Sequence, residues 1–232
     1  MGPLNGIKVL EFSGIGPGPY CGMLLADLGA DVIRLSRVSE KGTHNKFDIH
    51  NRSKRTIVSD LKNPKAIKEI KKLIHEVDVL FEGFRPGVME KLGLSPEECF
   101  KLNKSLVYGR MTGWGQEGPM SKQAGHDINY ISLSGALNAI GDQNSNPSIP
   151  LNLVGDYGGG GMMLAMGILA GVIRSSKTGK GQVIDSAMID GSLSLMSFFY
   201  SLKEMGIWND ARKSNLLDGA AHFYDTYQCA DS

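Results

Sequence analysis

The chain has 232 residues, of which 41% are hydrophobic and 21% are charged, a composition typical of a soluble globular protein with a sizeable core. The 25 Lys and Arg residues nearly balance the 24 Asp and Glu residues, so the net charge of +1 argues against a nucleic-acid or membrane-surface partner. Cys21, Cys99 and Cys229 are far apart and form no C-x-x-C pair, which argues against disulfides and zinc and favours a reducing, cytoplasmic compartment.

Apolar runs alternate with helix-like segments along most of the chain. Residues 7–12, 31–36, 56–61, 78–83, 106–113 and 182–190 are predicted strands, and residues 21–30, 64–77 and 95–103 are predicted helices. Strand, helix and strand within about thirty residues make a parallel βαβ unit. The pattern therefore predicts an α/β protein with a doubly wound, mainly parallel, Rossmann-like sheet.

The regular alternation ends near residue 205. We expect a large ligand-binding domain over residues 1–185, followed by a helix and linker over 186–232 that lead towards a smaller, incomplete domain. The last residues, TYQCADS, follow a strand-like approach without a closing helix, so a fragment of a longer protein is expected. The longest apolar run, residues 162–173, is expected to be a buried helix because it is too short to cross a bilayer.

The first loop, SGIGPGP (13–19), joins a predicted strand to a predicted helix, as the phosphate loop of a dinucleotide site does. Its glycine spacing differs from G-x-G-x-x-G, and the next strand carries Arg34 and Arg37 where a ribose-binding carboxylate is expected. Arginines at this place suit a phosphate. A tight loop flanked by surface arginines is the alternative.

Basic residues also gather at the ends of two further predicted strands. Because ligands of open α/β sheets bind beyond the carboxyl ends of the strands, this charge would suit a nucleotide or coenzyme A. A solvated basic face is the alternative. The residues concerned are Arg52, Lys54, Arg55, Lys62, Lys65, Arg85 and Lys91.

Two titratable residues stand at the starts of apolar helix-like runs. Asp156 precedes four glycines, which would let the backbone approach a ligand closely, but an aspartate is also a common helix N-cap. His126 precedes Asp127, itself a candidate N-cap, and a helix N-terminus favours the neutral imidazole that a general base requires. From the residues alone, a structural role remains open for both His126 and Asp156.

Several motifs together resemble the class III CoA-transferase superfamily, and most closely its racemase branch. They are LEFSGIGPGPYCGMLLADLGADVIRLSR, LFEGFRPGVMEKLGL, GRMTGWGQEGP, QAGHDINYISLSGAL, LNLVGDYGGGGMM and GKGQVIDSAMIDGS, spread over essentially the whole chain. The resemblance implies an acyl-CoA thioester substrate, an interlocked homodimer and no metal or redox cofactor, since CoA is part of the substrate. Neither nucleic acid nor a membrane is implied as a partner.

The resemblance also implies roles for particular residues. His126 and Asp156 match two acid/base residues that interconvert (R)- and (S)-2-methylacyl-CoA by removing and returning the α-proton. In a true CoA transferase the aspartate at position 156 would instead attack the thioester, and a histidine at position 126 is generally absent. Positions implied to contact the CoA nucleotide are Arg37, Ser59, Leu61, Lys62, Gly83, Phe84, Arg85 and Lys91, the last where arginine is expected. Positions implied to lie along the thioester are Gly125, Asp127, Ile128, Asn129 and Tyr130.

The family pattern places a further catalytic glutamate and most of a small domain beyond residue 232. These 232 residues alone are therefore expected to be inactive, whichever reaction the longer protein performs.

Overall fold

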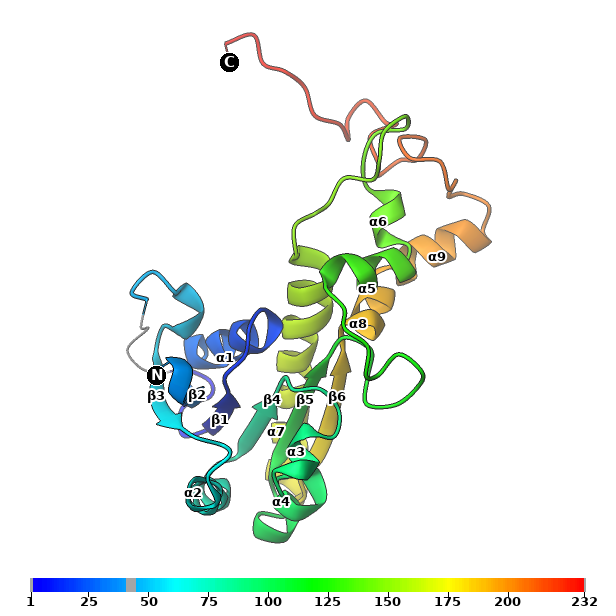
Figure 1. Ribbon diagram of the computed structural model, residues 1–232. Helices are drawn as coiled ribbons and strands as arrows, with labels where there is room; N and C mark the ends of the chain where they lie inside the picture. The colour runs from blue at the N-terminus through cyan, green and yellow to red at the C-terminus, as the bar shows by residue number, and fades with distance from the viewer. Residues whose placement is uncertain (1, 41–44, 232) are drawn as a thin grey trace.

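Six parallel strands form the centre of the part of the chain that the computed structural model describes, residues 2–40 and 45–231 (Figure 1). Their order in the sheet is β3-β2-β1-β4-β5-β6, which confirms the predicted doubly wound α/β fold. The strands are β1 (Lys8–Phe12), β2 (Asp31–Arg37), β3 (Lys54–Ser59), β4 (Val79–Glu82), β5 (Val107–Thr112) and β6 (Gln182–Ala187).

The last predicted strand was three residues too long. Thr112, the final residue of β5, pairs with Ala187, so the chain has no ladder partner beyond that point and turns into a helix at Met188.

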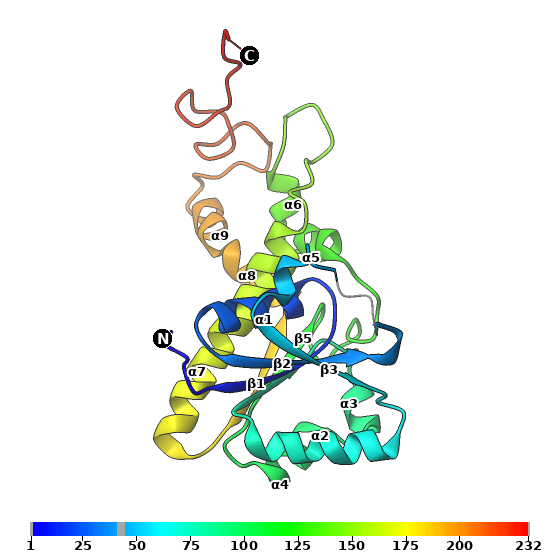
Figure 2. The same ribbon diagram turned by 90° about the vertical axis from the view of Figure 1, so that its left-hand side faces the viewer.

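Helices cover both faces of the sheet. They are α1 (Pro17–Asp27), α2 (Pro64–Glu76), α3 (Val88–Lys91), α4 (Pro96–Leu102), α5 (Asp127–Leu133), α6 (Ala136–Ala139), α7 (Met163–Thr178), α8 (Met188–Leu195) and α9 (Ser197–Glu204). Short 3-10 turns span Val38–Glu40 and Ile49–Asn51. Figure 2 shows α2 and α4 below the sheet and α1 above it.

Each face of the sheet has its own apolar core, because successive strand residues point to opposite faces. Val9 and Val79 pack with α1 and α7 on one face, while Leu10 and Leu80 pack with α2 and α4 on the other. All four of these side chains are fully buried. Burial on both faces explains why the central strands β1 and β4 are mostly apolar, whereas the edge strand β3 is largely exposed and carries more polar residues.

The strand order changes direction between β1 and β4. The chain runs outward from β1 through β2 to β3, then returns to β4 and continues to β5 and β6 on the other side. The connections that leave β1 and β4 therefore diverge and leave a crevice beyond the carboxyl ends of these strands. This crevice holds the candidate site.

The connection from β5 to β6 contains a long apolar helix. A π-helix over Leu153–Met162 (η3) runs directly into α7, and together they make 26 residues, enough by length and composition to cross a bilayer. The run is thus longer than the twelve residues predicted. It packs against α1, α8 and the strands β5 and β6 on one side, while Met162, Met166 and Ile173 are each more than half exposed, so the expected buried helix is buried on one face only.

The predicted domain boundary at residue 185 falls inside β6. The helix that follows, α8, packs closely against η3 and also contacts α5, so it belongs with the sheet domain. After α9 the chain continues without helix or strand, and Figure 1 shows it leading away from the sheet.

Candidate active site

A cavity of about 680 Å³ lies beyond the carboxyl ends of β1, β4 and β5. The segment Phe12–Gly18 after β1, the loop Gly83–Pro86 after β4 and the segment Thr112–Trp114 after β5 form its walls. The volume lies within the ordinary range for small-molecule sites. Its predicted lining residues are Arg37, Gly83, Phe84, Arg85, Gly125, His126, Tyr130 and Asp156, so the fold brings these distant positions to one place.

Asp156 lies in the first turn of η3, not at an N-cap, because Asn152 takes that position. The Nδ2–H of Asn152 donates to Asp156 Oδ2 at 3.2 Å. A Cβ placed on Gly16 would lie 3.3 Å from the same oxygen, so the loop after β1 needs glycine here to approach the carboxylate. Partial burial raises the pKa of Asp156, against the lowering effect of the Asn152 hydrogen bond. The environment thus shifts the Asp156 equilibrium towards the protonated form, relative to a free aspartate.

His126 stands at the N-cap of α5 in extended conformation, with its side chain exposed at the cavity. Its backbone N–H donates to Asn129 Oδ1 at 2.9 Å, as part of a capping box between His126 and Asn129 at the start of the helix. The charge of the His126 imidazole lowers the pKa of Asp156, so the two groups lie close enough to interact. The imidazole of His126 and the carboxyl group of Asp156 therefore share one cavity.

Asp127 corrects one prediction. It is the first residue of α5, not the N-cap, and it does not line the cavity but is buried behind Asp156 with only 6% of its surface exposed. Its Oδ2 accepts the backbone N–H of Asp156 at 2.7 Å, and a Cβ on Gly155 would lie just as close to that oxygen. Asp127 therefore holds the backbone of Asp156 through this hydrogen bond.

The far wall of the cavity is aromatic. The rings of Trp114 and Tyr130 meet edge to face with centroids 4.7 Å apart. A Cβ on Gly125 would lie 2.9 Å from atoms of both rings, so only glycine lets the chain pass here just before His126. Burial, and secondarily the charge of Asp156, raises the pKa of Tyr130 to about 12, so its hydroxyl is neutral at physiological pH.

The comparisons with known proteins agree with this geometry. The family model described as CoA-transferase family III matches residues 4–232. The chain belongs to that family. It is 46% identical to alpha-methylacyl-CoA racemase of Mus musculus and to that of Homo sapiens over 98% of its own length, and it spans 59% of each of those proteins. Identity to human succinyl-CoA:glutarate CoA-transferase is 33%, over 91% of this chain and 52% of that protein.

Solved structures of family members share the fold. A CAIB/BAIF family protein from Brucella suis has a TM-score of 0.80 at 29% identity, and the match covers 88% of this chain and 58% of that one. Rv3272 from Mycobacterium tuberculosis has a TM-score of 0.78 at 31% identity, over 88% of this chain and 59% of that one. The doubly wound sheet is thus the sheet of family III.

Two arginines of β2, Arg34 and Arg37, were predicted to bind a phosphate. Only Arg37 is available to a ligand in the cavity. The guanidinium of Arg34 donates to Glu40 at 2.6 Å and to Ser36 at 2.7 Å, so its charge is already compensated. Arg37 lines the cavity instead, with its guanidinium carbon 5.9 Å from the centre of the Phe84 ring. Arg85 lines the same wall.

Most of the basic cluster around β3 is paired with carboxylates. Arg52 forms an ion pair with Asp27, and Arg55 forms one with Asp31. Lys54 is fully buried, 2.7 Å from Glu11, and also donates to the carbonyl of Pro19 at 2.9 Å. The alternative of a solvated basic face therefore holds for Arg52 and Arg55, whereas Lys54 forms a buried ion pair instead.

Seven predicted ligand-contacting positions are not among the described residues that line the cavity. Ser59 pairs with Arg37 across β2 and β3, and Leu61 packs on the apolar core beneath. Lys62 and Lys91 are exposed, and Ile128 and Asn129 point from the exposed side of α5. The seventh is Asp127, which is buried behind Asp156. Contact of the six others with CoA remains a prediction.

The four glycines after Asp156 lie in close contact with other segments of the protein. A Cβ on Gly159 would lie 2.8 Å from the backbone nitrogen of Ser192 in α8, and one on Gly161 would lie 2.8 Å from the carbonyl of Pro17 in α1. Gly191 of α8 meets Gly159 from the other side. These glycines therefore let three helices pack in close contact, and an approach to a ligand stays a prediction.

The structure also adds lining residues that sequence reasoning missed. Trp114 stands within the quoted motif GRMTGWGQEGP, and Asn152 and Tyr157 stand in the same motif as Asp156. Their place within these motifs was the signal that the sequence offered. Tyr157 stacks at a tilt on Tyr20, with ring centroids 4.9 Å apart. Gln123 and Met188 also line the cavity, and each stands within a quoted motif, QAGHDINYISLSGAL and GKGQVIDSAMIDGS respectively.

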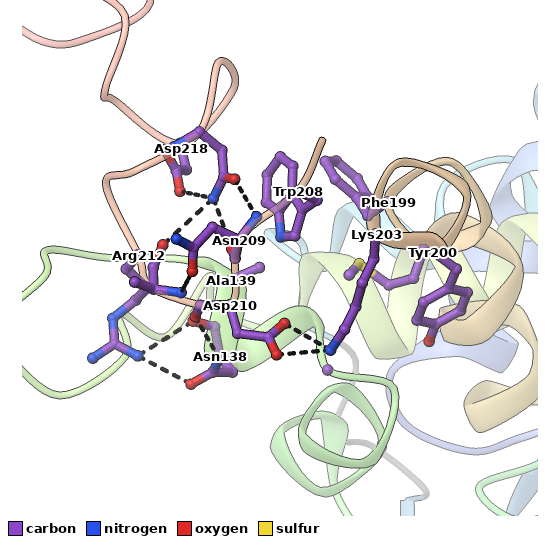
Figure 3. Close-up of a pocket in the computed structure, with 14 residues that line it drawn as sticks. Asn138, Ala139, Phe199, Tyr200, Lys203, Trp208, Asn209, Asp210, Arg212 and Asp218 are labelled. Atoms are coloured by element: carbon purple, nitrogen blue, oxygen red, sulfur yellow. Dashed lines mark hydrogen bonds and ion pairs between the residues drawn. The ribbon is translucent and has the colours of Figure 1, made fainter. Parts of the chain in front are cut away.

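A second, smaller cavity of about 160 Å³ lies between α6, α9 and the segment 208–218 (Figure 3). The ion pair of Lys203 with Asp210, at 2.7 Å, and the edge-to-face contact of Phe199 with Trp208 hold that segment against α9. The predicted site residues lie elsewhere, so we assign this cavity to the packing of the C-terminal segment.

Proposed function

We propose that the full-length product of this gene interconverts (R)- and (S)-2-methylacyl-CoA thioesters by removing and returning the α-proton. The observation that carries the proposal is the presence of His126 and Asp156 together in the cavity at the switch point of the sheet. The 46% identity to two alpha-methylacyl-CoA racemases, against 33% to a CoA-transferase, supports the racemase reaction over CoA transfer.

In the proposed reaction, neutral His126 removes the α-proton from one enantiomer while protonated Asp156 delivers a proton to the opposite face. The reverse reaction exchanges the two roles through the same enolate. Burial of Asp156 supports its acid role because it favours the protonated form. Each general acid or base of this kind contributes roughly 10²- to 10⁴-fold. No metal or redox cofactor takes part in the proposed reaction.

We further propose that the protein acts as a homodimer in the cytoplasm. Free, buried Cys21 and Cys99 support a reducing compartment. Large apolar side chains near the site support a partner or a further domain that covers them, since Leu133, Leu151 and Leu153 are each more than half exposed.

The exchange of the α-proton with solvent tests the reaction directly. Full-length protein incubated with a 2-methylacyl-CoA in D₂O should place deuterium at C2, observed by NMR. A parallel incubation with free carboxylic acids should show no movement of CoA. Absence of deuterium with a range of methyl-branched substrates, or efficient CoA transfer, would contradict the proposal.

His126→Ala should abolish the exchange while CoA binding stays largely intact. The expected loss is about 10²-fold or more, as for removal of a general base. Unchanged exchange in this variant would return His126 to a purely structural role at the start of α5.

A further inference from the structure

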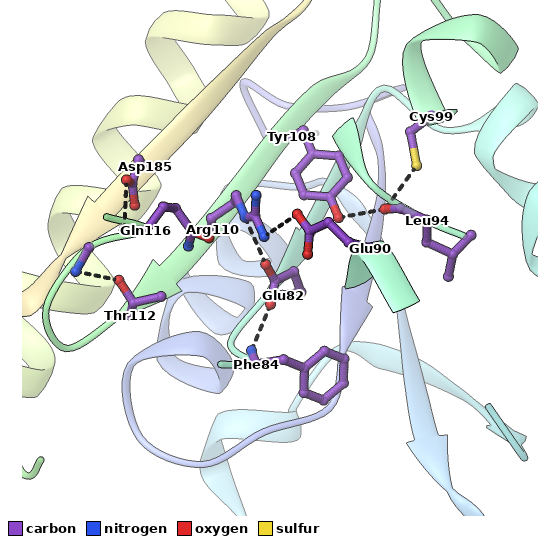
Figure 4. Close-up of polar contacts among 11 residues, drawn as sticks. Glu82, Phe84, Glu90, Leu94, Cys99, Tyr108, Arg110, Thr112, Gln116 and Asp185 are labelled. Carbon is purple, nitrogen blue, oxygen red and sulfur yellow. Dashed lines mark hydrogen bonds and ion pairs between the residues drawn. The ribbon is translucent and has the colours of Figure 1, made fainter. Parts of the chain in front are cut away.

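The loop after β4 is held in place by a buried carboxylate that is not among the residues lining the cavity. Glu82 is the last residue of β4, and its side chain is 1% exposed. Its Oε2 accepts the backbone N–H of Phe84 at 2.6 Å, which fixes the turn Gly83–Arg85 at the edge of the cavity (Figure 4). All three residues of this turn, Gly83, Phe84 and Arg85, are positions predicted to contact the CoA nucleotide.

Arg110 fixes the carboxylate of Glu82 in turn. The two residues face each other across β4 and β5, and Arg110 Nε lies 3.3 Å from Glu82 Oε1. The other end of the guanidinium, Nη2, pairs with Glu90 Oε1 at 2.9 Å, on α3. Glu82 thus cannot swing away from the Phe84 amide without leaving a buried arginine incompletely paired, which is costly.

The hydrogen bond to Phe84 also affects where the guanidinium of Arg37 lies. The Phe84 ring packs edge to face on Phe12, with centroids 6.0 Å apart, and presents its surface to Arg37 at 5.9 Å. A shift of the Phe84 backbone would therefore move both the aromatic surface under Arg37 and the adjacent Arg85. All of Arg37, Phe84 and Arg85 line the cavity.

We infer that Glu82 is a positioning residue for the nucleotide end of the acyl-CoA site, acting through the Phe84 amide to place Arg37 and Arg85. The inference rests on the proposed function for the identity of the ligand. Glu82 lies under the wall formed by β4, whereas His126 and Asp156 come from α5 and η3. Glu82 is therefore assigned to binding and not to proton transfer.

The test compares Glu82→Gln with the unaltered full-length protein on two thioesters of the same 2-methyl acid, one of CoA and one of pantetheine, which lacks the nucleotide. We expect KM for the CoA thioester to rise about 5- to 10-fold with kcat within twofold. KM for the pantetheine thioester should stay within twofold. Because KM does not depend on the fraction of folded molecules, partial unfolding cannot produce this difference.

Glu90→Gln is the matched control, since it removes the other carboxylate of Arg110 but leaves the Phe84 hydrogen bond; both KM values should stay within twofold. Equal KM increases for both thioesters in Glu82→Gln, or a fall in kcat for both, would overturn the inference, as would no change. If Glu82→Gln is not soluble, Glu82→Asp, which keeps the charge but shortens the reach, should show the same selectivity.

Failure of the proposed function would appear separately. If the unaltered protein exchanges no α-proton, calorimetric affinities for CoA and for pantetheine still test Glu82. A Glu82→Gln variant that binds CoA 5- to 10-fold more weakly and pantetheine unchanged would support the positioning role, and equal affinities would refute it.

Discussion

At the scale of single residues, two polar neighbours act on the Asp156 carboxyl in opposite directions. Asn152 donates a hydrogen bond that favours the carboxylate and lowers the pKa of Asp156. Asp127 holds the Asp156 backbone, and its negative charge raises the pKa of Asp156. Removing either influence should therefore move the ionisation of the proposed acid without removing the acid itself.

Asn152→Ala should raise the pKa of Asp156 further. In the direction of reaction that uses Asp156 as base, the rising limb of kcat/KM against pH should move to higher pH. The measurement is the pH profile of solvent deuterium exchange with a single enantiomer.

Asp127→Asn should move the same limb to lower pH, because the like charge beside Asp156 is removed while the shape of the side chain is kept. Shifts of the same sign in the two variants, or no shift in either, would show that Asp156 does not set this limb.

At the scale of elements, the contact of η3 with α8 depends on paired glycines. Gly159 and Gly191 leave no room for a side chain on either helix, so the two backbones lie in direct contact. Because η3 carries Asp156 and α8 continues directly from β6, this contact ties the proposed acid to the sheet.

Gly159→Ala should destabilise the protein, by roughly 1–3 kcal/mol, as overpacking of a close contact does. Gly18→Ala, in α1 where nothing lies within 4 Å of the added methyl group, should be neutral or slightly stabilising. The free energy of unfolding from urea titration compares the two variants. An equal effect of both substitutions would mean that the η3–α8 contact adjusts without cost.

At the scale of the whole molecule, two buried carboxyls on the central strands β1 and β4 link stability to pH. Burial raises the pKa of both Glu11 and Glu82 from the ordinary 4.5 to about 7, despite the nearby Lys54 and Arg110. The folded protein therefore binds more protons than the unfolded chain between about pH 4.5 and pH 7.

The free energy of unfolding should consequently fall as the pH rises through this range, by at most about 1.4 kcal/mol per pH unit for each carboxyl. Urea titrations at a series of pH values measure the slope. Glu82→Gln should flatten it, because one of the two titrating groups is lost. A free energy of unfolding that rises over the same range would contradict the burial argument.

The sequence by itself determined the sheet, its parallel order of strand and helix, and the family. Apolar runs and the turns between them are local, and burial on both faces leaves a clear mark on the central strands. It also singled out His126 and Asp156, through the family resemblance and their place before helical runs. Boundaries were less certain, as the end of β6 shows, since it depends on where β5 stops offering a partner.

Only the tertiary structure decided what each charged or glycine residue does. Arg52 and Arg55 looked like ligand cations until Asp27 and Asp31 were found to pair with them, and only the fold shows that Asp127 holds the backbone of Asp156. Such roles depend on partners that the chain brings together over long separations, and no local pattern encodes them. The role of Glu82 could not be predicted for the same reason, because its partner Arg110 is distant in the sequence.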